Sequence, residues 1–266
     1  MSTTNTWTNA AVAALLACGS LAPAHAQQCQ IQSAAQRVTV IELYTSEGCN
    51  SCPPADRWFS GLAQQGVSPD KAILLAFHVD YWNQLGWTDR FSRPSFSARQ
   101  RDVASRASRG VVYTPQVVLD GRDLRHAYNV EQLRGKLADI NHQKGQAKIQ
   151  ANVSRSGNDV DVSGEVQMLD PKMSKGAWVW IAAFENGLSS PVNAGENAGK
   201  RLYHDYVVRD LAGPFLLGAD GRAQLNQHIT LPPDANATRT GIAIFIERSD
   251  TGEVLEAISQ YPLCPA

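Results

Sequence analysis

Hydrophobic and polar positions divide the chain into two parts with different patterns. In the first part, residues 38–44 (VTVIELY) and 71–79 (KAILLAFHV) are apolar runs of the length and composition of buried strands. Residues 55–63 between them place Trp58 and Leu62 on one face and predict a helix. The first part therefore begins with a strand, a helix and a second strand.

A long insertion and a hairpin follow. Residues 80–110 are expected to form a helical or loop insertion, and residues 116–119 another strand. Asp120-Gly121 favours a two-residue hairpin turn after that strand. Asn129, with Gln132 three residues later, predicts the start of a helix that runs to about residue 141. The predicted order over residues 36–143 is β-α-β-α-β-β-α.

After residue 145 the pattern changes to alternation. Ile149, Ala151 and Val153 alternate with polar residues, which is typical of strands with one buried face. Residues 145–266 are therefore predicted to form a second, all-β domain that resembles a sandwich. A polar loop at residues 193–209 is either a contact site for a partner or a brace between the two domains.

The first 26 residues predict an exported protein. Residues 10–17 form a short apolar run, and Ala24-His25-Ala26 fits the small-x-small pattern of a signal-peptide cleavage site. The apolar run is too short to span a bilayer, so no membrane span is expected. The segment before Cys18 also fits a lipoprotein cleavage site, which would make Cys18 a lipid anchor. A secreted or periplasmic location is expected.

The cysteines of an exported protein are expected to form disulfides, because disulfides persist outside the cytoplasm. Four cysteines remain after a signal peptide that includes Cys18 is removed. Cys49 and Cys52 are local partners, and Cys29 and Cys264 lie near the two ends of the mature chain, where a structural bridge is expected. The formal net charge of the 266 residues is -1, which argues against nucleic acid as a main partner.

The segment 48–54 (GCNSCPP) places a CxxC pair between the first strand and the first helix. Unpaired N–H groups at a helix N-terminus stabilise a thiolate, so Cys49 is the expected nucleophile and Cys52 the resolving thiol.

An aromatic segment follows the second strand. Tyr81, Trp82 and Trp87, together with His78, are expected to form one wall of a substrate groove beside the cysteines; the alternative is a hydrophobic lid that packs the insertion onto the sheet. His78 is interpreted as a core or groove residue, and no metal ligand is expected. The arginines of residues 93–109 are interpreted as the solvated face of the insertion helix.

These residues carry two resemblances. The CxxC after the first strand and Thr114-Pro115 before the hairpin resemble the thioredoxin-like superfamily, which implies a cis Pro115 that faces the cysteines. The same resemblance implies a buried carboxylate that relays protons to the cysteines, with Glu42 as the candidate; the alternative is an ordinary strand position, because alternation can point it to the opposite face. The chain also resembles a family of predicted secreted bacterial proteins known only as a domain of unknown function. The segments that carry this second resemblance are 42–56, 78–87, 112–116, Gly195-Glu196-Asn197 and His204. The expected fold is thus an α/β thioredoxin-like domain followed by an all-β, sandwich-like domain.

Three functions are compatible with this sequence. The first is an exported thiol–disulfide oxidoreductase or isomerase that acts through the CxxC pair on protein thiols or disulfides in the cell envelope. The second is a non-enzymatic binding module whose CxxC is a structural disulfide. The third is a copper-handling protein, because two thiolates suit Cu(I). No cofactor is expected for the first two functions.

Overall fold

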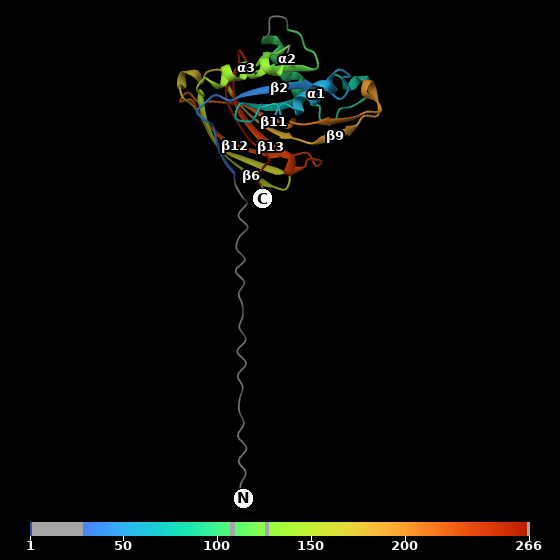
Figure 1. The fold of residues 1–266 in the computed structure, drawn as a ribbon. Helices are drawn as coiled ribbons and strands as arrows, with labels where there is room; N and C mark the ends of the chain where they lie inside the picture. The colour runs from blue at the N-terminus through green and yellow to red at the C-terminus, as the bar shows by residue number, and fades with distance from the viewer. Residues whose placement is uncertain (2–28, 107–109, 126–127, 265–266) are drawn as a thin grey trace.

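The computed structural model of the protein describes Met1 and residues 29–106, 110–125 and 128–264. Strands predominate, and they form an eight-stranded sheet, a four-stranded sheet and a two-stranded ribbon (Figure 1). The predicted signal peptide and Cys18 lie outside the described residues. Among those residues no helix is both long and apolar enough to cross a membrane.

The eight-stranded sheet has the order β14-β13-β8-β11-β3-β2-β4-β5. Its strands are β2 (Thr39–Thr45), β3 (Ala72–His78), β4 (Gln116–Leu119), β5 (Arg122–Asp123), β8 (Ala177–Glu185), β11 (Val207–Leu216), β13 (Thr240–Arg248) and β14 (Val254–Gln260). The four-stranded sheet has the order β1-β6-β7-β12. Its strands are β1 (Cys29–Gln32), β6 (Ala147–Ser156), β7 (Asp159–Met168) and β12 (Arg222–Thr230).

The ribbon consists of β9 (Leu188–Pro191) and β10 (Arg201–His204). The described residues contain three α-helices, α1 (Cys52–Ser60), α2 (Pro94–Arg106) and α3 (Val130–Asn141). Four short 3₁₀ turns connect the larger elements within the same residues: η1 (Asn83–Leu85), η2 (Pro171–Met173), η3 (Gly195–Asn197) and η4 (Ala237–Arg239).

The long sheet runs through both halves of the chain, so the expected thioredoxin-like domain with a separate β domain is wrong. β11 lies parallel to β3, with Val207 opposite Ala76, and the Ala76 N–H donates to the Tyr206 carbonyl at 2.7 Å. An unpaired β3 would expose a row of backbone donors and acceptors, and β11 from the second half satisfies them. The predicted boundary at residue 145 falls just before β6, but strand pairing crosses it.

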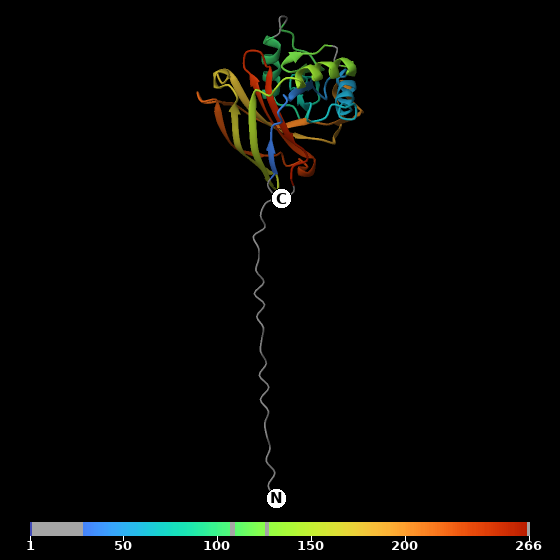
Figure 2. The same cartoon turned by 60° about the vertical axis from the view of Figure 1, so that its left-hand side comes forward.

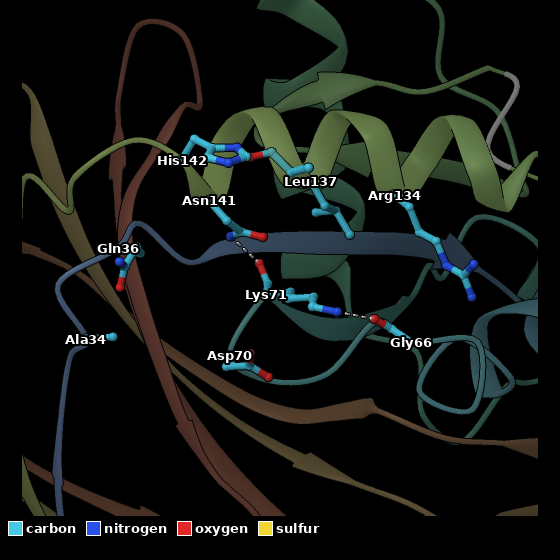
Figure 3. Close-up of a pocket in the computed structure, with 10 residues that line it drawn as sticks. Ala34, Gln36, Gly66, Asp70, Lys71, Arg134, Leu137, Asn141 and His142 are labelled. Carbon is cyan, nitrogen blue, oxygen red and sulfur yellow. Dashed lines mark hydrogen bonds between the residues drawn. The ribbon is translucent and has the colours of Figure 1, made fainter.

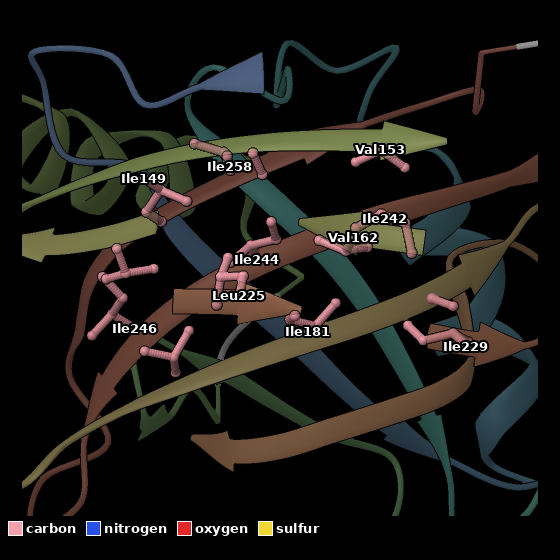
Figure 4. Close-up of a cluster of buried hydrophobic side chains, with 14 of the residues drawn as sticks. Ile149, Val153, Val162, Ile181, Leu225, Ile229, Ile242, Ile244, Ile246 and Ile258 are labelled. Carbon is pink, nitrogen blue, oxygen red and sulfur yellow. The ribbon is translucent and has the colours of Figure 1, made fainter. Parts of the chain in front are cut away.

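Three layers cover the long sheet. On one face, α2 packs Phe96 against Phe77 and Phe245. On the other face, α1 and α3 cover β2, β3 and β4, and the four-stranded sheet covers β8, β13 and β14. Figure 2 shows these layers from the side, and Figure 4 shows the apolar side chains that fill the sandwich between the two sheets. α1 is thereby fixed against the ends of the two central parallel strands.

Several local predictions are confirmed. The hairpin turn has positive φ at Asp120 (54°) and Gly121 (73°), as a type I′ turn requires. The Asn129 side chain caps α3 by accepting from the Gln132 N–H at 3.0 Å. Cys29 and Cys264 form a disulfide with their Cα atoms 5.9 Å apart.

Candidate functional site

A disulfide joins Cys49 and Cys52, whose Cα atoms lie 5.4 Å apart. Cys49 follows β2 in a tight loop, and Cys52 is the first residue of α1. Pro53 and Pro54 fit the first turn of this helix because the backbone N–H groups they lack would have no partner there. The helix therefore begins at Cys52, and both cysteines are 0% exposed.

The loop that carries the disulfide is covered by η3 of the C-terminal half. The Asn197 side-chain amide donates to the carbonyls of Glu47 and Cys49, at 2.9 Å each. The Glu196 carboxylate accepts from the Asn50 N–H at 3.1 Å. The site is thus assembled from segments nearly 150 residues apart in the chain.

A buried cluster of Glu47, Asp56 and His204 lies next to the disulfide loop. His204, on β10, places Nε2 3.2 Å from Glu47 Oε1 and Nδ1 3.6 Å from Asp56 Oδ2. Thr45 donates to Asp56 at 2.8 Å, and the Trp87 indole donates to Glu47 at 2.8 Å. None of the three ionisable side chains is more than 6% exposed. The charges of this buried cluster are therefore compensated mainly by one another.

The charge state of the cluster follows from these contacts. Burial by itself lowers the pKa of His204, but the nearby carboxylates of Asp56 and Glu47 outweigh it and raise that pKa to about 10. Burial by itself raises the pKa of Glu47, but the hydrogen bond with His204 lowers it overall. His204 is consequently an imidazolium at neutral pH, and Glu47 is a carboxylate.

A second buried pair extends the cluster. His78 Nδ1 lies 2.6 Å from Asp89 Oδ2, and the same carboxylate oxygen accepts from the Glu47 N–H at 2.9 Å. The His78 and His204 rings meet edge to face with centroids 4.9 Å apart. Burial alone would raise the pKa of Asp89, but the charge of His78 and its hydrogen bond lower it. The two pairs form one continuous set of ionisable groups beside the cysteines.

Comparison with known proteins places the chain in a family. Residues 40–247 match the model of a protein family of unknown function, DUF1223. The chain belongs to the DUF1223 family. The resemblance to a domain of unknown function is thereby confirmed, and the resemblance to the thioredoxin-like superfamily is not. The matched region spans both halves of the long sheet, as expected for one folded unit. A search of the curated proteins found no match.

Two solved structures are similar to this DUF1223 protein. Protein AGR_C_4864 from Agrobacterium tumefaciens shares 26% identity over 85% of this chain and 95% of that one, with a TM-score of 0.57. HBP35 of Porphyromonas gingivalis shares 12% identity over 87% of this chain and 76% of that one, with a TM-score of 0.65. At 12% identity, the similarity to HBP35 shows a similar fold and nothing more.

The DUF1223 structure places Glu42 away from the cysteines. Glu42 is aligned with Leu75 and Val118 on the face covered by α2, where its carboxylate lies 2.7 Å from the Arg99 guanidinium. The neighbouring residues Ile41 and Leu43 face α1 and α3 instead. Because α1 carries the CxxC motif on the opposite face of the sheet, this position does not support the proton-relay role predicted for Glu42.

The predicted aromatic wall lies next to the disulfide loop. The Trp82 indole donates to the Thr114 hydroxyl at 2.8 Å, and a Cβ on Gly48 would come within 2.9 Å of Trp82 Cβ. Thr114 precedes Pro115 through a cis peptide bond. Trp82 therefore connects the Thr-Pro segment to the loop that carries Cys49. Tyr81, also half-buried, instead donates to Gln100 of α2 at 3.1 Å.

His78 does not line an open groove, because its side chain is 0% exposed. Together with Asp56 and His204 it borders only a small enclosed space between α1 and the sheet. Sequence reasoning gave Glu47, Asp56 and His204 no role of their own and noted them only within the segments that carry the family resemblance. The Glu47–His204 contact joins residues 157 positions apart, which no local pattern reveals. In residues 29–106, 110–125 and 128–264, no group of three or more His, Cys, Asp or Glu side chains is arranged to hold a metal ion.

A wide pocket lies away from this site. Its volume is about 650 Å³, and it is bordered by Gln36 before β2, by Asp70 and Lys71 before β3, and by the second half of α3 (Figure 3). The cysteines follow the other end of β2, so the pocket and the disulfide lie at opposite ends of these strands. Lys71 donates to the Gly66 carbonyl at 3.0 Å within the pocket. The pocket is separate from the chemistry of the CxxC.

Proposed function

We propose that this DUF1223 protein is an exported thiol–disulfide oxidoreductase or isomerase that acts on protein thiols or disulfides in the cell envelope through Cys49 and Cys52. The observation that carries the proposal is the buried cluster of Glu47, Asp56 and His204 beside the disulfide. A disulfide that only stabilises a fold needs no ionisable groups next to it, and burying such groups is unfavourable unless they are paired. Buried, perturbed ionisable groups are instead characteristic of sites that move protons.

In the reductive direction, the Cys49 thiolate attacks one sulfur of a substrate disulfide. A Cys49–substrate mixed disulfide forms, and the other substrate sulfur leaves as a thiolate that takes up a proton. The Cys52 thiolate then attacks Cys49 Sγ and releases the second substrate sulfur, which also becomes a thiol. The substrate gains two electrons and two protons, and the protein ends with the Cys49–Cys52 disulfide. A dithiol reductant restores the starting state, and the reverse sequence oxidises a substrate dithiol.

The buried cluster has a defined part in this cycle. Asp56 lies four residues after Cys52 on α1, the spacing that places two side chains on one face of a helix. We assign Asp56 the exchange of a proton with Cys52 when the disulfide opens or closes. His204, protonated at neutral pH, compensates the negative charge beside the disulfide. His204 and Glu47 are positioning residues in this scheme.

A second candidate function rests on the complete burial of both cysteines. A disulfide without solvent exposure is protected from exchange, as expected for a permanent structural bridge. In that case the protein is a binding module, and the CxxC stabilises the start of α1.

The reduction potential of the Cys49–Cys52 pair separates these two functions. The protein is equilibrated with glutathione buffers of known potential, and each cysteine is followed by thiol labelling and mass analysis. A potential of roughly -270 to -120 mV is expected for an exchange protein, and its value indicates the direction of the reaction. A pair that remains oxidised below about -300 mV is a structural disulfide, and the oxidoreductase proposal is then wrong.

Two variants complete the experiment. Cys49→Ser is expected to abolish exchange with a disulfide substrate, because the attacking thiolate is lost. Cys29→Ser combined with Cys264→Ser removes the other disulfide and is expected to leave exchange intact, since that bridge ties β1 to the C-terminus. Exchange that persists in the Cys49 variant would contradict the mechanism.

A further inference from the structure

We propose that η3, residues Gly195–Asn197, is a lid that closes the cysteine pair in the resting protein, and that the substrate is an extended polypeptide whose backbone replaces the lid. This inference rests on the proposed function. Exchange requires a thiolate to approach a disulfide sulfur, yet Cys49 and Cys52 are 0% exposed while Asn50 and Ser51 between them are exposed. A segment of the protein must therefore move before any substrate reacts.

The contacts of η3 identify it as that segment. Its two polar side chains satisfy three backbone groups of the disulfide loop: the carbonyls of Glu47 and Cys49 and the Asn50 N–H. Asn197 is itself 0% exposed, and Lys200 donates to its side-chain oxygen at 2.9 Å, which fixes the orientation of the amide. The lid thus covers the loop through directed hydrogen bonds.

The chain around η3 is built to let it move independently. The ribbon β9–β10 pairs only with itself among the described strands. Two glycines have positive φ: Gly195 (71°) is the first residue of the lid and Gly199 (80°) lies two residues beyond it, with no atom within 4 Å of a Cβ placed on Gly199. His204, the last residue of β10, lies 3.2 Å from Glu47 and 3.6 Å from Asp56 and holds the end of that strand. Rotation at the glycines would lift η3 while β10 stays in place.

The backbone groups that lose their partners when the lid opens indicate the class of substrate. Two backbone carbonyls and one backbone N–H face outward once η3 leaves, and buried backbone groups need new partners. An extended polypeptide offers alternating N–H donors and carbonyl acceptors, as in the addition of a peptide to an exposed backbone edge. A disulfide held in such a segment would lie over Cys49. A small disulfide supplies fewer of these partners, so a disulfide-bonded polypeptide is the favoured substrate class.

The lid is tested by the rate at which dithiothreitol reduces the Cys49–Cys52 disulfide, followed by thiol labelling and mass analysis. Asn197→Ala removes two of the three hydrogen bonds and is expected to raise the rate constant about tenfold. Asn141→Ala is the matched control, because Asn141 also donates to two backbone carbonyls, those of Arg37 and Lys71, at the far end of the sheet. Its rate constant is expected to stay within twofold of the wild type.

Glu196→Ala provides a second variant whose fold is not at risk, because Glu196 is exposed. It removes the remaining hydrogen bond, and an increase of about threefold is expected. Urea unfolding of each variant measures its global stability. It shows whether the rate of reduction rises more than the greater population of the unfolded protein would account for. The lid proposal is overturned if neither variant is reduced faster than the wild type. This result is independent of the reduction potential, so the lid and the oxidoreductase proposal can fail separately.

The substrate class is tested with the reduced protein. The rate of exchange with a disulfide-bonded polypeptide, such as insulin, is compared with that of glutathione disulfide at equal disulfide concentration. The polypeptide is expected to react at least tenfold faster. Equal rates would overturn the polypeptide assignment and leave the lid as a barrier to small and large disulfides alike.

Discussion

The disulfide between Cys29 and Cys264 is expected to be the main covalent stabiliser of the fold. Cys29 is the first residue of β1, which pairs with β6 at the edge of the four-stranded sheet. Cys264 follows Leu263, which is 4% exposed and packs in the core between the two sheets. The bridge therefore ties the two sheets of the sandwich together at one edge. The double variant Cys29→Ser/Cys264→Ser removes this bridge and tests its contribution to stability.

The expected loss follows from the length of chain that the bridge closes. Its cysteines are 235 residues apart, and the loss of loop entropy in the unfolded chain then corresponds to about 5 kcal/mol. The same relation gives about 2 kcal/mol for the Cys49–Cys52 bridge, whose separation is 3. We expect the double variant to lose about 3 to 5 kcal/mol of unfolding free energy, which lowers the Tm by about 10 °C in a domain of this size.

Guanidinium unfolding followed by tryptophan fluorescence measures this loss, with Cys49→Ser/Cys52→Ser as the matched comparison. The larger loss should occur in the variant without the 29–264 bridge. A loss below about 1 kcal/mol in that variant would refute the entropic reasoning. Loss of disulfide exchange in Cys29→Ser/Cys264→Ser would show that the activity of the Cys49–Cys52 pair depends on the 29–264 bridge.

Three further perturbations test the buried charges. Burial raises the pKa of Glu256 to about 7, above the value of 4.5 expected in the unfolded chain, so the wild type should lose about 3 kcal/mol of stability as pH rises from 4.5 past 7. Glu256→Gln should flatten this part of the pH profile, and equal slopes in both proteins would count against the assignment. The pKa of His204 is raised from 6.5 to about 10, so its stabilisation is complete below pH 6.5 and disappears as pH approaches 10. His204→Gln should remove that alkaline loss, measured as the difference between the two urea-unfolding profiles. Arg99→Met leaves the buried Glu42 without its cation and Glu247 with Arg106 alone, 3.9 Å away, and should cost about 3 to 5 kcal/mol. The exposed Arg101→Met on the same helix should change stability by less than about 0.5 kcal/mol; similar losses in both variants would refute the role given to Arg99.

Much of the local structure was predictable because its signals are close together in the chain. The apolar runs at 38–44 and 71–79 became β2 and β3. The Asp120-Gly121 turn and the Asn129 cap depend on backbone conformations and hydrogen bonds within a few residues. The position of the CxxC between β2 and α1 followed from the same local patterns.

The prediction for Arg99 was wrong because local patterns carry no information about distant partners. Its position in an arginine-rich helix indicated a solvated side chain, but Arg99 is only 7% exposed and lies between the carboxylates of Glu42 and Glu247. Glu42 is on β2 and Glu247 on β13, at opposite sides of the long sheet's centre. Neither carboxylate is near Arg99 in sequence, so the pairing that permits its burial leaves no trace in the helix pattern.

The sequence by itself determined strands such as β2, β3 and β4, the hairpin, the helix cap and the Cys49–Cys52 pair, because each depends on residue type and short-range spacing. It missed β10 and the start of β11, which lie in the segment read as a polar loop. Tertiary structure alone decided that the second half of the chain extends the sheet of the first, through β11 beside β3. It also decided that Asn197 and His204 meet the CxxC loop. These arrangements arise because an open sheet edge and buried charges must find partners, and the partners that satisfy them are more than a hundred residues away.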